Sequence, residues 1–209
     1  MNLFELYTDI NIHLLQDNKP SDYLNRIYSN PLFQQYPFDM LYKLKSTEQS
    51  RKHHPEGNVW NHTVLVVDEA AKLKSKSSDI SILMWAALLH DIGKPLTTKV
   101  KNNKITSYDH DKLGAKLSKE FLQIFTDDEK FINGVSGLVR YHMQILFVVN
   151  DLPFADIQGM KEYTDINEVA LLGLCDRLGR TNCDRVKEEN NIELFLNIVN
   201  RKLYLKHPS

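Results

Sequence analysis

Apolar residues recur every three or four positions along most of this chain, which is the spacing of one buried face of an α-helix. The pattern predicts helices over residues 3–15, 20–28 and a third segment ending near Lys45, followed by longer helices in the rest of the chain. The one candidate for strands, Thr98–Ser107, is short and polar and predicts a turn or small hairpin around Asn102 and Asn103. We therefore expect an all-α fold.

The segment Ile80–Leu89 is apolar nearly all round, which is typical of a fully buried helix. His90 and Asp91 follow it directly, and Gly93 and Pro95 signal that the helix ends there. The imidazole and the carboxylate are therefore expected in its last turn, facing the interior. A buried carboxylate needs a cationic partner, because an unpaired buried charge is costly, and a metal ion shared with His90 would provide one.

Two further predicted helices carry a histidine on their apolar face. In the segment 58–73, His62 lies three residues after Val59 and four before Val66. A second helical pattern starts at Asp109 and reaches about Phe125, with His110 in its first turn on the buried side. A lone histidine at such a position is most often a hydrogen-bonded core residue, and His110 could also cap its own helix.

Two more predicted helices carry a polar residue, one histidine and one aspartate, on their apolar face. Thr126 and Glu129 suggest a capping box that opens a helix running to Ile145, with His142 in the middle of its apolar face. Asp165 and Glu168 could cap a helix that places Asp176 where the pattern requires an apolar residue. The simpler interpretation of Asp176 is a salt bridge to Arg177 or Arg180.

Taken together, the inward polar residues supply the ligand types of one divalent transition ion, or of two ions sharing a carboxylate. Lys94, three residues after Asp91, could neutralise a phosphate oxygen, and Arg140 or Arg180 could make a forked contact, although each could equally be a solvated cation at a helix end. His54 and Glu56 precede the first ligand helix and either line the same pocket or lie on the surface. The predicted ligands are His62, His90, Asp91, His110, His142 and Asp176.

Composition narrows the function. The formal charge of −1 over 209 residues leaves no overall basic footprint, so small phosphate esters suit the chain better than duplex nucleic acid does. Two cysteines and the lack of a long apolar run argue against a disulfide framework or a membrane span, and we expect a cytoplasmic protein. The expected organisation is an N-terminal helical segment, residues 1–50, packed on a main domain, residues 51–209.

The ordered set His62, His90-Asp91 and Asp176 resembles the signature of the HD superfamily of metal-dependent phosphohydrolases, and Ala87–Lys94 is similar to its central motif. Between about residues 37 and 185 the chain also resembles the HD domain that follows the catalytic head of some bacterial CCA-adding tRNA nucleotidyltransferases. No Gly-Ser motif with paired carboxylates, as in that head, fits residues 1–50, so we do not expect CCA addition. The segments that carry this second resemblance are 54–63, 108–115, 138–143 and 175–180.

The resemblance implies an HD-domain helical bundle that hydrolyses phosphate mono- or diesters of nucleotides, including 2′,3′-cyclic ones. It implies one or two ions of nickel, manganese, iron or magnesium: His62, His90, Asp91 and Asp176 would hold the first, and Asp91 would bridge to a second held by His110 and His142. Asp91 and Lys94 are the expected catalytic residues. The expected partners are a small nucleotide or phosphate ester and RNA ends, with no membrane.

Two other interpretations stay open at this point. One is a non-catalytic HD fold that serves as a nucleotide sensor or RNA-associated binding module. The other is an all-α interaction module whose polar residues satisfy one another, which predicts no bound metal and tolerance of Asp91→Asn.

Overall fold

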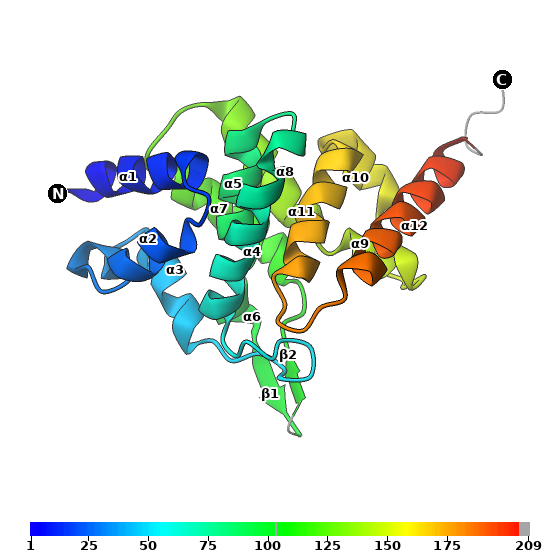
Figure 1. Cartoon of the computed structure of the whole chain (residues 1–209), viewed down its shortest axis with the longest axis horizontal. Helices are drawn as coiled ribbons and strands as arrows, with labels where there is room; N and C mark the ends of the chain where they lie inside the picture. The colour runs from blue at the N-terminus through cyan, green and yellow to red at the C-terminus, as the bar shows by residue number, and fades with distance from the viewer. Residues whose placement is uncertain (103, 205–209) are drawn as a thin grey trace.

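The computed structural model describes residues 1–102 and 104–204, and these form a bundle of helices with one small projecting hairpin (Figure 1). The all-α expectation is confirmed. The helices of the N-terminal part are α1 (Leu3–Gln16), α2 (Ser21–Ile27), η1 (Pro31–Gln34), α3 (Asp39–Tyr42) and η2 (Lys43–Ser46). Those that follow are α4 (Val59–Leu73), η3 (Lys74–Lys76), α5 (Ile80–Leu89), α6 (Lys94–Thr97), α7 (His110–Leu122), α8 (Glu129–Tyr141), α9 (Gln144–Val149), α10 (Ile157–Tyr163), α11 (Ile166–Leu178) and α12 (Arg185–Tyr204).

Helix α5 is the centre of the bundle, in contact with α1, α4, α8 and α11 (Figure 1). Every residue from Leu83 to Leu89 is buried, as expected for a helix that is apolar on all sides. The helix ends earlier than predicted: its last residue is Leu89, so His90 is its C-cap and Asp91 lies in the turn that follows, two residues beyond the helix. That turn is closed by a hydrogen bond from Ile92 N to Leu89 O, and α6 begins at once with Lys94.

The predicted course of α8 needs two corrections. Asp128 caps its N-terminus by accepting a hydrogen bond from Phe131 N, whereas Thr126 accepts only from Asp128 N, so the Thr126–Glu129 capping box is wrong. The helix also stops at Tyr141 instead of continuing to Ile145, and α9 starts afresh at Gln144. The Val139 carbonyl accepts from the His142 ring at 2.7 Å, which favours a change of direction at this point.

The N-terminal helices pack on α4 and α5. Helix α1 opens with a capping box between Asn2 and Glu5, and Asn11 on it accepts a hydrogen bond from Trp85 of α5 at 2.9 Å. Ser21 of α2 donates both its backbone N–H and its hydroxyl to the buried carboxylate of Asp68 on α4. Direct contacts thus hold α1 and α2 against the two helices that lead to the polar cluster described below.

Strands β1 (Lys99–Lys101) and β2 (Lys104–Thr106) form the small hairpin that the sequence predicts. They pair antiparallel, with Val100 opposite Ile105 and Lys101 opposite Lys104, and the hairpin extends away from the helices (Figure 1). Among the described helices, none combines the length and the apolar character that crossing a membrane requires.

Candidate metal centre

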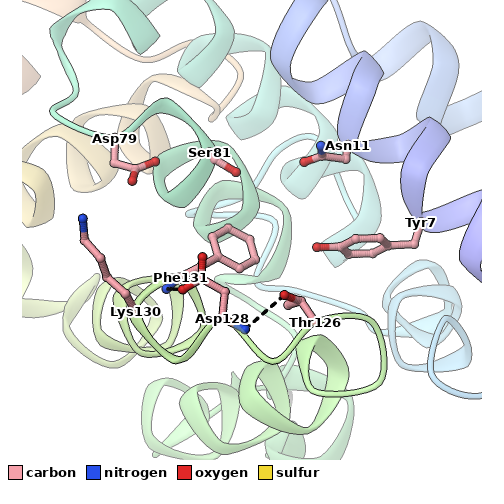
Figure 2. A pocket seen from close by; sticks show the side chains of 8 residues that line it. All are labelled: Tyr7, Asn11, Asp79, Ser81, Thr126, Asp128, Lys130 and Phe131. Atoms are coloured by element: carbon pink, nitrogen blue, oxygen red, sulfur yellow. Dashed lines mark hydrogen bonds between the residues drawn. The ribbon is translucent and has the colours of Figure 1, made fainter.

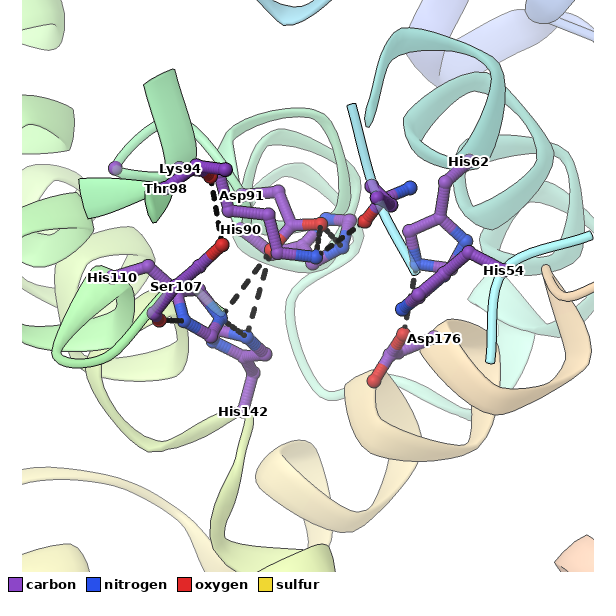
Figure 3. Close-up of polar contacts among 12 residues, drawn as sticks. His54, His62, His90, Asp91, Lys94, Thr98, Ser107, His110, His142 and Asp176 are labelled. Carbon is purple, nitrogen blue, oxygen red and sulfur yellow. Dashed lines mark hydrogen bonds and ion pairs between the residues drawn. The ribbon is translucent and has the colours of Figure 1, made fainter. Parts of the chain in front are cut away.

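All six predicted ligands meet at the C-terminal end of α5 (Figure 3). Each is buried, although they come from parts of the chain more than 100 residues apart. The cluster lies where the turn after α5 meets the N-terminus of α7, the C-terminus of α8 and the facing sides of α4 and α11. The residues are His62 on α4, His90 and Asp91 after α5, His110 at the start of α7, His142 after α8 and Asp176 on α11.

Three of the histidines are held in the same way. The Nδ1 atoms of His90, His110 and His142 each contact the backbone carbonyl three residues earlier, at 2.8, 2.6 and 2.7 Å. A carbonyl oxygen only accepts, so each Nδ1 carries the hydrogen. Each Nε2 therefore keeps its lone pair and points into the cluster.

Two of these lone pairs face one another. Nε2 of His110 lies 3.2 Å from Nε2 of His142, and Asp91 Oδ1 lies 3.5 Å from the former and 4.0 Å from the latter. Burial lowers the pKa of both imidazoles, that of His142 to about 4, so neither is expected to carry a second proton at neutral pH. Apposed lone pairs beside a carboxylate form an unfavourable arrangement that a cation among them would stabilise.

The Asp91 carboxylate is paired with a cation at one oxygen only. Among the described residues, Oδ1 accepts no hydrogen bond, and Nε2 of His90, which lies 3.3 Å from Oδ2, also has no hydrogen-bond partner. Lys94 Nζ lies 2.7 Å from Asp91 Oδ2 and donates to Gln49 Oε1. Burial alone would raise the pKa of Asp91, but His90 and Lys94 beside it lower that pKa well below its usual range. The Oδ1 atom of Asp91 is therefore available to a metal ion.

His62 lies on the other side of Asp91 and is surrounded by carboxylates. Its Nε2 is 2.9 Å from Asp176 Oδ1, and its Nδ1 is 2.9 Å from Glu56 Oε1. Burial alone would lower the pKa of His62, but Asp176 and Glu56 outweigh it and the pKa is raised. Burial also disfavours the charged form of Asp176, yet Arg180 at 3.4 Å and His62 lower its pKa. This half of the cluster favours a charged imidazole.

Glu56 belongs to the cluster although the sequence left its position open. Only 2% of its side chain is exposed, and Oε1 also contacts Nδ1 of His54 at 2.9 Å. Burial alone would raise the pKa of Glu56, but His54 and His62 lower it, and burial lowers the pKa of His54 to about 4. His54 therefore lies in the pocket and not on the free surface. Gln49 was missed, since nothing in its sequence context separates it from a surface polar residue.

Gly93 allows the turn after α5 to approach α7 closely. A Cβ atom there would lie 2.2 Å from the carbonyl oxygen of His110 and 2.8 Å from Gly114 N. Only a residue without a side chain fits at that distance. The glycine that signals the end of α5 in the sequence thus also brings Asp91 next to His110.

The three predicted substrate contacts lie in different surroundings. Lys94 is buried next to Asp91, and Arg180 contacts Asp176 while its Nε has no hydrogen-bond partner among the described residues. Arg140 instead donates to Asp111 at 2.6 Å, linking α8 to α7 outside the histidine cluster. Of the two salt bridges considered for Asp176, the one to Arg180 is present, whereas Arg177 pairs with Glu188.

A separate hollow lies at the opposite end of α5 (Figure 2). It includes the N-cap Asp79 and residues of α1 and α8, and histidine and cysteine are both missing from its lining. It offers little to a transition metal. Its lining residues are Tyr7, Asn11, Asp79, Ser81, Thr126, Asp128, Lys130 and Phe131.

Comparison with known proteins agrees with this geometry. The HD domain family matches residues 59–181, which include every one of the six clustered residues. The chain belongs to the HD domain family. The HD family is one of metal-dependent phosphohydrolases, and the His and Asp groups described above could hold a divalent ion.

Curated relatives of this HD protein are named Multifunctional CCA protein. That of Actinobacillus pleuropneumoniae serotype 5b (strain L20) is 37% identical over 97 residues, which cover 45% of this chain and 22% of the relative. Those of Pasteurella multocida (strain Pm70) and Methylococcus capsulatus are 35% identical over 109 residues and 30% over 105, covering 26% and 23% of the relatives. The chain thus spans about a quarter of the length of these proteins, and the resemblance noted in the sequence is confirmed for the HD domain.

Proposed function

We propose that this protein hydrolyses phosphate mono- or diesters of nucleotides at a divalent metal centre formed by His62, His90, Asp91, His110, His142 and Asp176. The observation that carries the proposal is the meeting of the His110 and His142 Nε2 atoms, 3.2 Å apart and next to Asp91 Oδ1, which accepts no hydrogen bond within the described chain. A purely structural contact would place a donor opposite each acceptor. Here the two Nε2 atoms and Oδ1 place acceptors opposite acceptors.

The donor set fits a first-row divalent ion. Neutral imidazoles and carboxylates suit nickel, manganese, iron and zinc, and carboxylates suit magnesium. A bound ion supplies a Lewis acid that makes a water molecule more acidic and polarises a phosphoryl oxygen. The Nδ1 contacts of His90, His110 and His142 fix both the tautomer and the ring orientation before any ion arrives.

Hydrolysis joins the oxygen of a water molecule to phosphorus, breaks the bond from phosphorus to the ester oxygen, and delivers one proton to that leaving oxygen. Lys94 lies 2.7 Å from Asp91, which places its ammonium where it would neutralise a non-bridging phosphate oxygen. Arg180 contacts Asp176, and its Nε has no hydrogen-bond partner in the part of the chain that the structure describes, so it is the second cation that we assign to the phosphate. Arg140 is held by Asp111, so we assign it to positioning α7 against α8.

The test compares purified wild-type protein with Asp91→Asn, using elemental analysis for bound metal and phosphate release from a panel of 2′-, 3′-, 5′- and 2′,3′-cyclic nucleotides. Asn keeps the shape of Asp91 and removes its charge. We expect the wild type alone to hold a divalent metal and to hydrolyse members of the panel, with at least about a thousandfold less activity in the variant, as for loss of a transition-state contact worth about 4 kcal/mol.

Asp68→Asn is the matched control. Asp68, on α4, is another buried carboxylate, but it accepts hydrogen bonds from Ser21 instead of facing the cluster. It should keep metal and activity. A wild type that neither binds manganese or nickel nor hydrolyses any nucleotide would contradict the proposal and favour a non-catalytic module. Equal metal content and activity in wild type and Asp91→Asn would contradict the assignment of the site.

A further inference from the structure

Two segments project beside the metal centre, the loop 49–58 and the hairpin 98–107, and we call them the two arms. The loop is closed by a backbone bridge between Glu48 and Asn58, and the hairpin is closed at its base by the hydroxyls of Thr98 and Ser107 at 2.7 Å. Figure 1 shows the chain before α4 and the hairpin at the same end of the molecule.

Lys94 contacts the first residue of each arm. Its side chain donates to Gln49 at the start of the loop, and its carbonyl accepts from the backbone N–H of Thr98 at the start of the hairpin. The hairpin also returns to the centre, because the Ser107 carbonyl accepts from the ring of His110 (Figure 3). A ligand on the arms would therefore be continuous with one bound at Lys94.

The arms are cationic although the protein is not. They carry five Lys and Arg residues and one carboxylate, Glu56, which is buried against His54 and His62. Their formal charge is thus +4, whereas the whole chain carries −1, which leaves −5 for the remaining residues. All five cations are exposed, and within the described chain none forms an ion pair with a carboxylate. They are Arg51, Lys52, Lys99, Lys101 and Lys104.

The arrangement of the lysines on the hairpin is electrostatically unfavourable. Lys101 lies directly opposite Lys104 in the strand register, and Lys99 is two residues away and so on the same face. Like charges directly opposite one another destabilise a strand pair. The row repeats about every 6.6 Å along the strand, at about 3.3 Å per residue. A polyanion lying along this face would offset the repulsion.

An exposed aromatic residue follows the hairpin in the chain. Tyr108 follows the hairpin, lies two residues before His110 and is 73% exposed. Proteins that bind single-stranded nucleic acids combine a cationic track for the phosphates with aromatic rings on which bases stack. The arms provide the first feature, and Tyr108, two residues before His110 in the chain, provides the second.

We propose that the two arms and Tyr108 bind a single-stranded polynucleotide whose terminal phosphate group enters the metal centre. This inference rests on the proposed hydrolysis and names its substrate class: the phosphorylated end of a strand in preference to a free nucleotide. The remaining residues are acidic overall, which favours a single strand over the long footprint of a duplex.

The experiment measures kcat/KM for mononucleotides and for ten-residue oligoribonucleotides that end in the same 2′-, 3′- or 2′,3′-cyclic phosphate, at several salt concentrations. The test variant carries K99Q, K101Q and K104Q. The control variant carries K19Q, K72Q and K161Q, which remove the same charge from exposed lysines on other parts of the surface. We expect the wild type to favour the oligonucleotide at least about tenfold at low salt.

The hairpin variant should lose this preference and keep its activity on mononucleotides, while the control variant behaves as the wild type. The slope of log(kcat/KM) for the oligonucleotide against log(salt) should become shallower by about 2, since each phosphate contact on a single strand contributes about 0.7. Tyr108→Ala should lower the oligonucleotide value about tenfold, and Tyr108→Phe, which keeps the ring, should restore it.

Binding of a fluorescent oligoribonucleotide to Asp91→Asn protein, followed by anisotropy, separates this inference from the proposed function. Binding that the hairpin variant abolishes would support the arms even if no substrate were hydrolysed. Hydrolysis of mononucleotides with no preference for oligonucleotides would overturn the inference and leave the proposed function standing. Equal competition by poly-glutamate would overturn it too, because it would show attraction to any polyanion.

Discussion

The buried histidines on the two sides of Asp91 are held in environments that favour opposite protonation states. On one side, His110 and His142 bind backbone carbonyls through Nδ1, their pKa values are lowered, and their Nε2 lone pairs meet 3.2 Å apart. On the other, His62 lies between the carboxylates of Asp176 and Glu56, and its pKa is raised. The first side is arranged for a cation that is not a proton, whereas the second favours a proton.

This difference bears on the number of ions. The lowered pKa values mean that an ion entering the His110 and His142 side displaces little or no proton, whereas an ion binding to His62 must compete with the proton favoured by its carboxylate neighbours. We therefore expect two unequal affinities, with the His110 and His142 side filled over a wider range of pH. Asp91 lies within reach of both groups of ligands.

The largest expected effect comes from single substitutions on the two sides. If two ions share Asp91, His142→Gln and His62→Gln should each remove about one equivalent of metal, and Asp91→Asn should remove both. A single shared ion would instead be lost, or bound at least about a hundredfold more weakly, in all three variants. Metal titration followed by calorimetry distinguishes these results, with Asp68→Asn as the control.

The same variants test whether the cluster is merely structural. In the presence of a chelator, His142→Gln should unfold at the temperature of the wild type or a few degrees above it, because it removes one of two apposed lone pairs. A change of about 1 kcal/mol corresponds to roughly 2–4 °C in a chain of this size. If His142 were an ordinary hydrogen-bonded core residue, the variant would unfold several degrees lower.

The next effect concerns pH. His142 has a pKa of about 4 in the folded protein, against about 6.5 in an unfolded chain, so between these values the unfolded chain binds more protons. Stability of the metal-free protein that depends on neutral His142 is therefore present above pH 6.5 and is lost as the pH falls toward 4. Chemical denaturation from pH 7.5 to 4.5 would show it.

His62 contributes in the opposite direction, since its raised pKa adds stability below pH 6.5 that is lost as the pH rises through the raised value. The difference between the wild type and His142→Gln at each pH isolates the contribution of His142. Since the variant unfolds at or above the temperature of the wild type near neutral pH, its relative stability should increase further toward acid, where the wild type alone loses the contribution of neutral His142. A difference independent of pH would show that His142 is not buried in its neutral form.

Periodicity and motif order were sufficient to place all six clustered residues inward, because four of them interrupt an apolar face at helical spacing and His90 and Asp91 directly follow a helix that is apolar on all sides. They could not place the ends of the helices: His90 and His142 lie just beyond their helices, where ring contacts to Ala87 and Val139 carbonyls take over. Such contacts depend on tertiary packing and leave no trace in the periodicity.

Loop residues were the harder part for the same reason. Glu56 and Gln49 belong to no periodic element, and their partners His62 and Lys94 are reached only when the chain folds back. Arg140 illustrates the same limit, since the sequence left it open between a forked phosphate contact and a helix-end cation, and its partner Asp111 lies on the neighbouring helix.

A smaller effect is expected from Glu56→Gln. Removing this carboxylate should lower the pKa of His62, so that metal binding releases fewer protons and half-saturation moves to lower pH. Metal affinity near neutral pH should change less than about tenfold. Calorimetry in buffers of different ionisation enthalpy measures the protons released, and Glu120→Gln on the surface of α7 is the control. Unchanged proton release would mean that Glu56 does not act on His62.

The smallest effect is expected from Arg140→Lys, and it decides between two roles for this residue. Arg140 donates to Asp111 at 2.6 Å with 26% of its side chain exposed, so a lysine should lose the direct bond at a cost of about 1 kcal/mol or less. As a positioning residue it should lower the unfolding temperature by a few degrees and leave KM within about twofold. A raised KM with an unchanged unfolding temperature would instead support the forked phosphate contact that the sequence left open for Arg140.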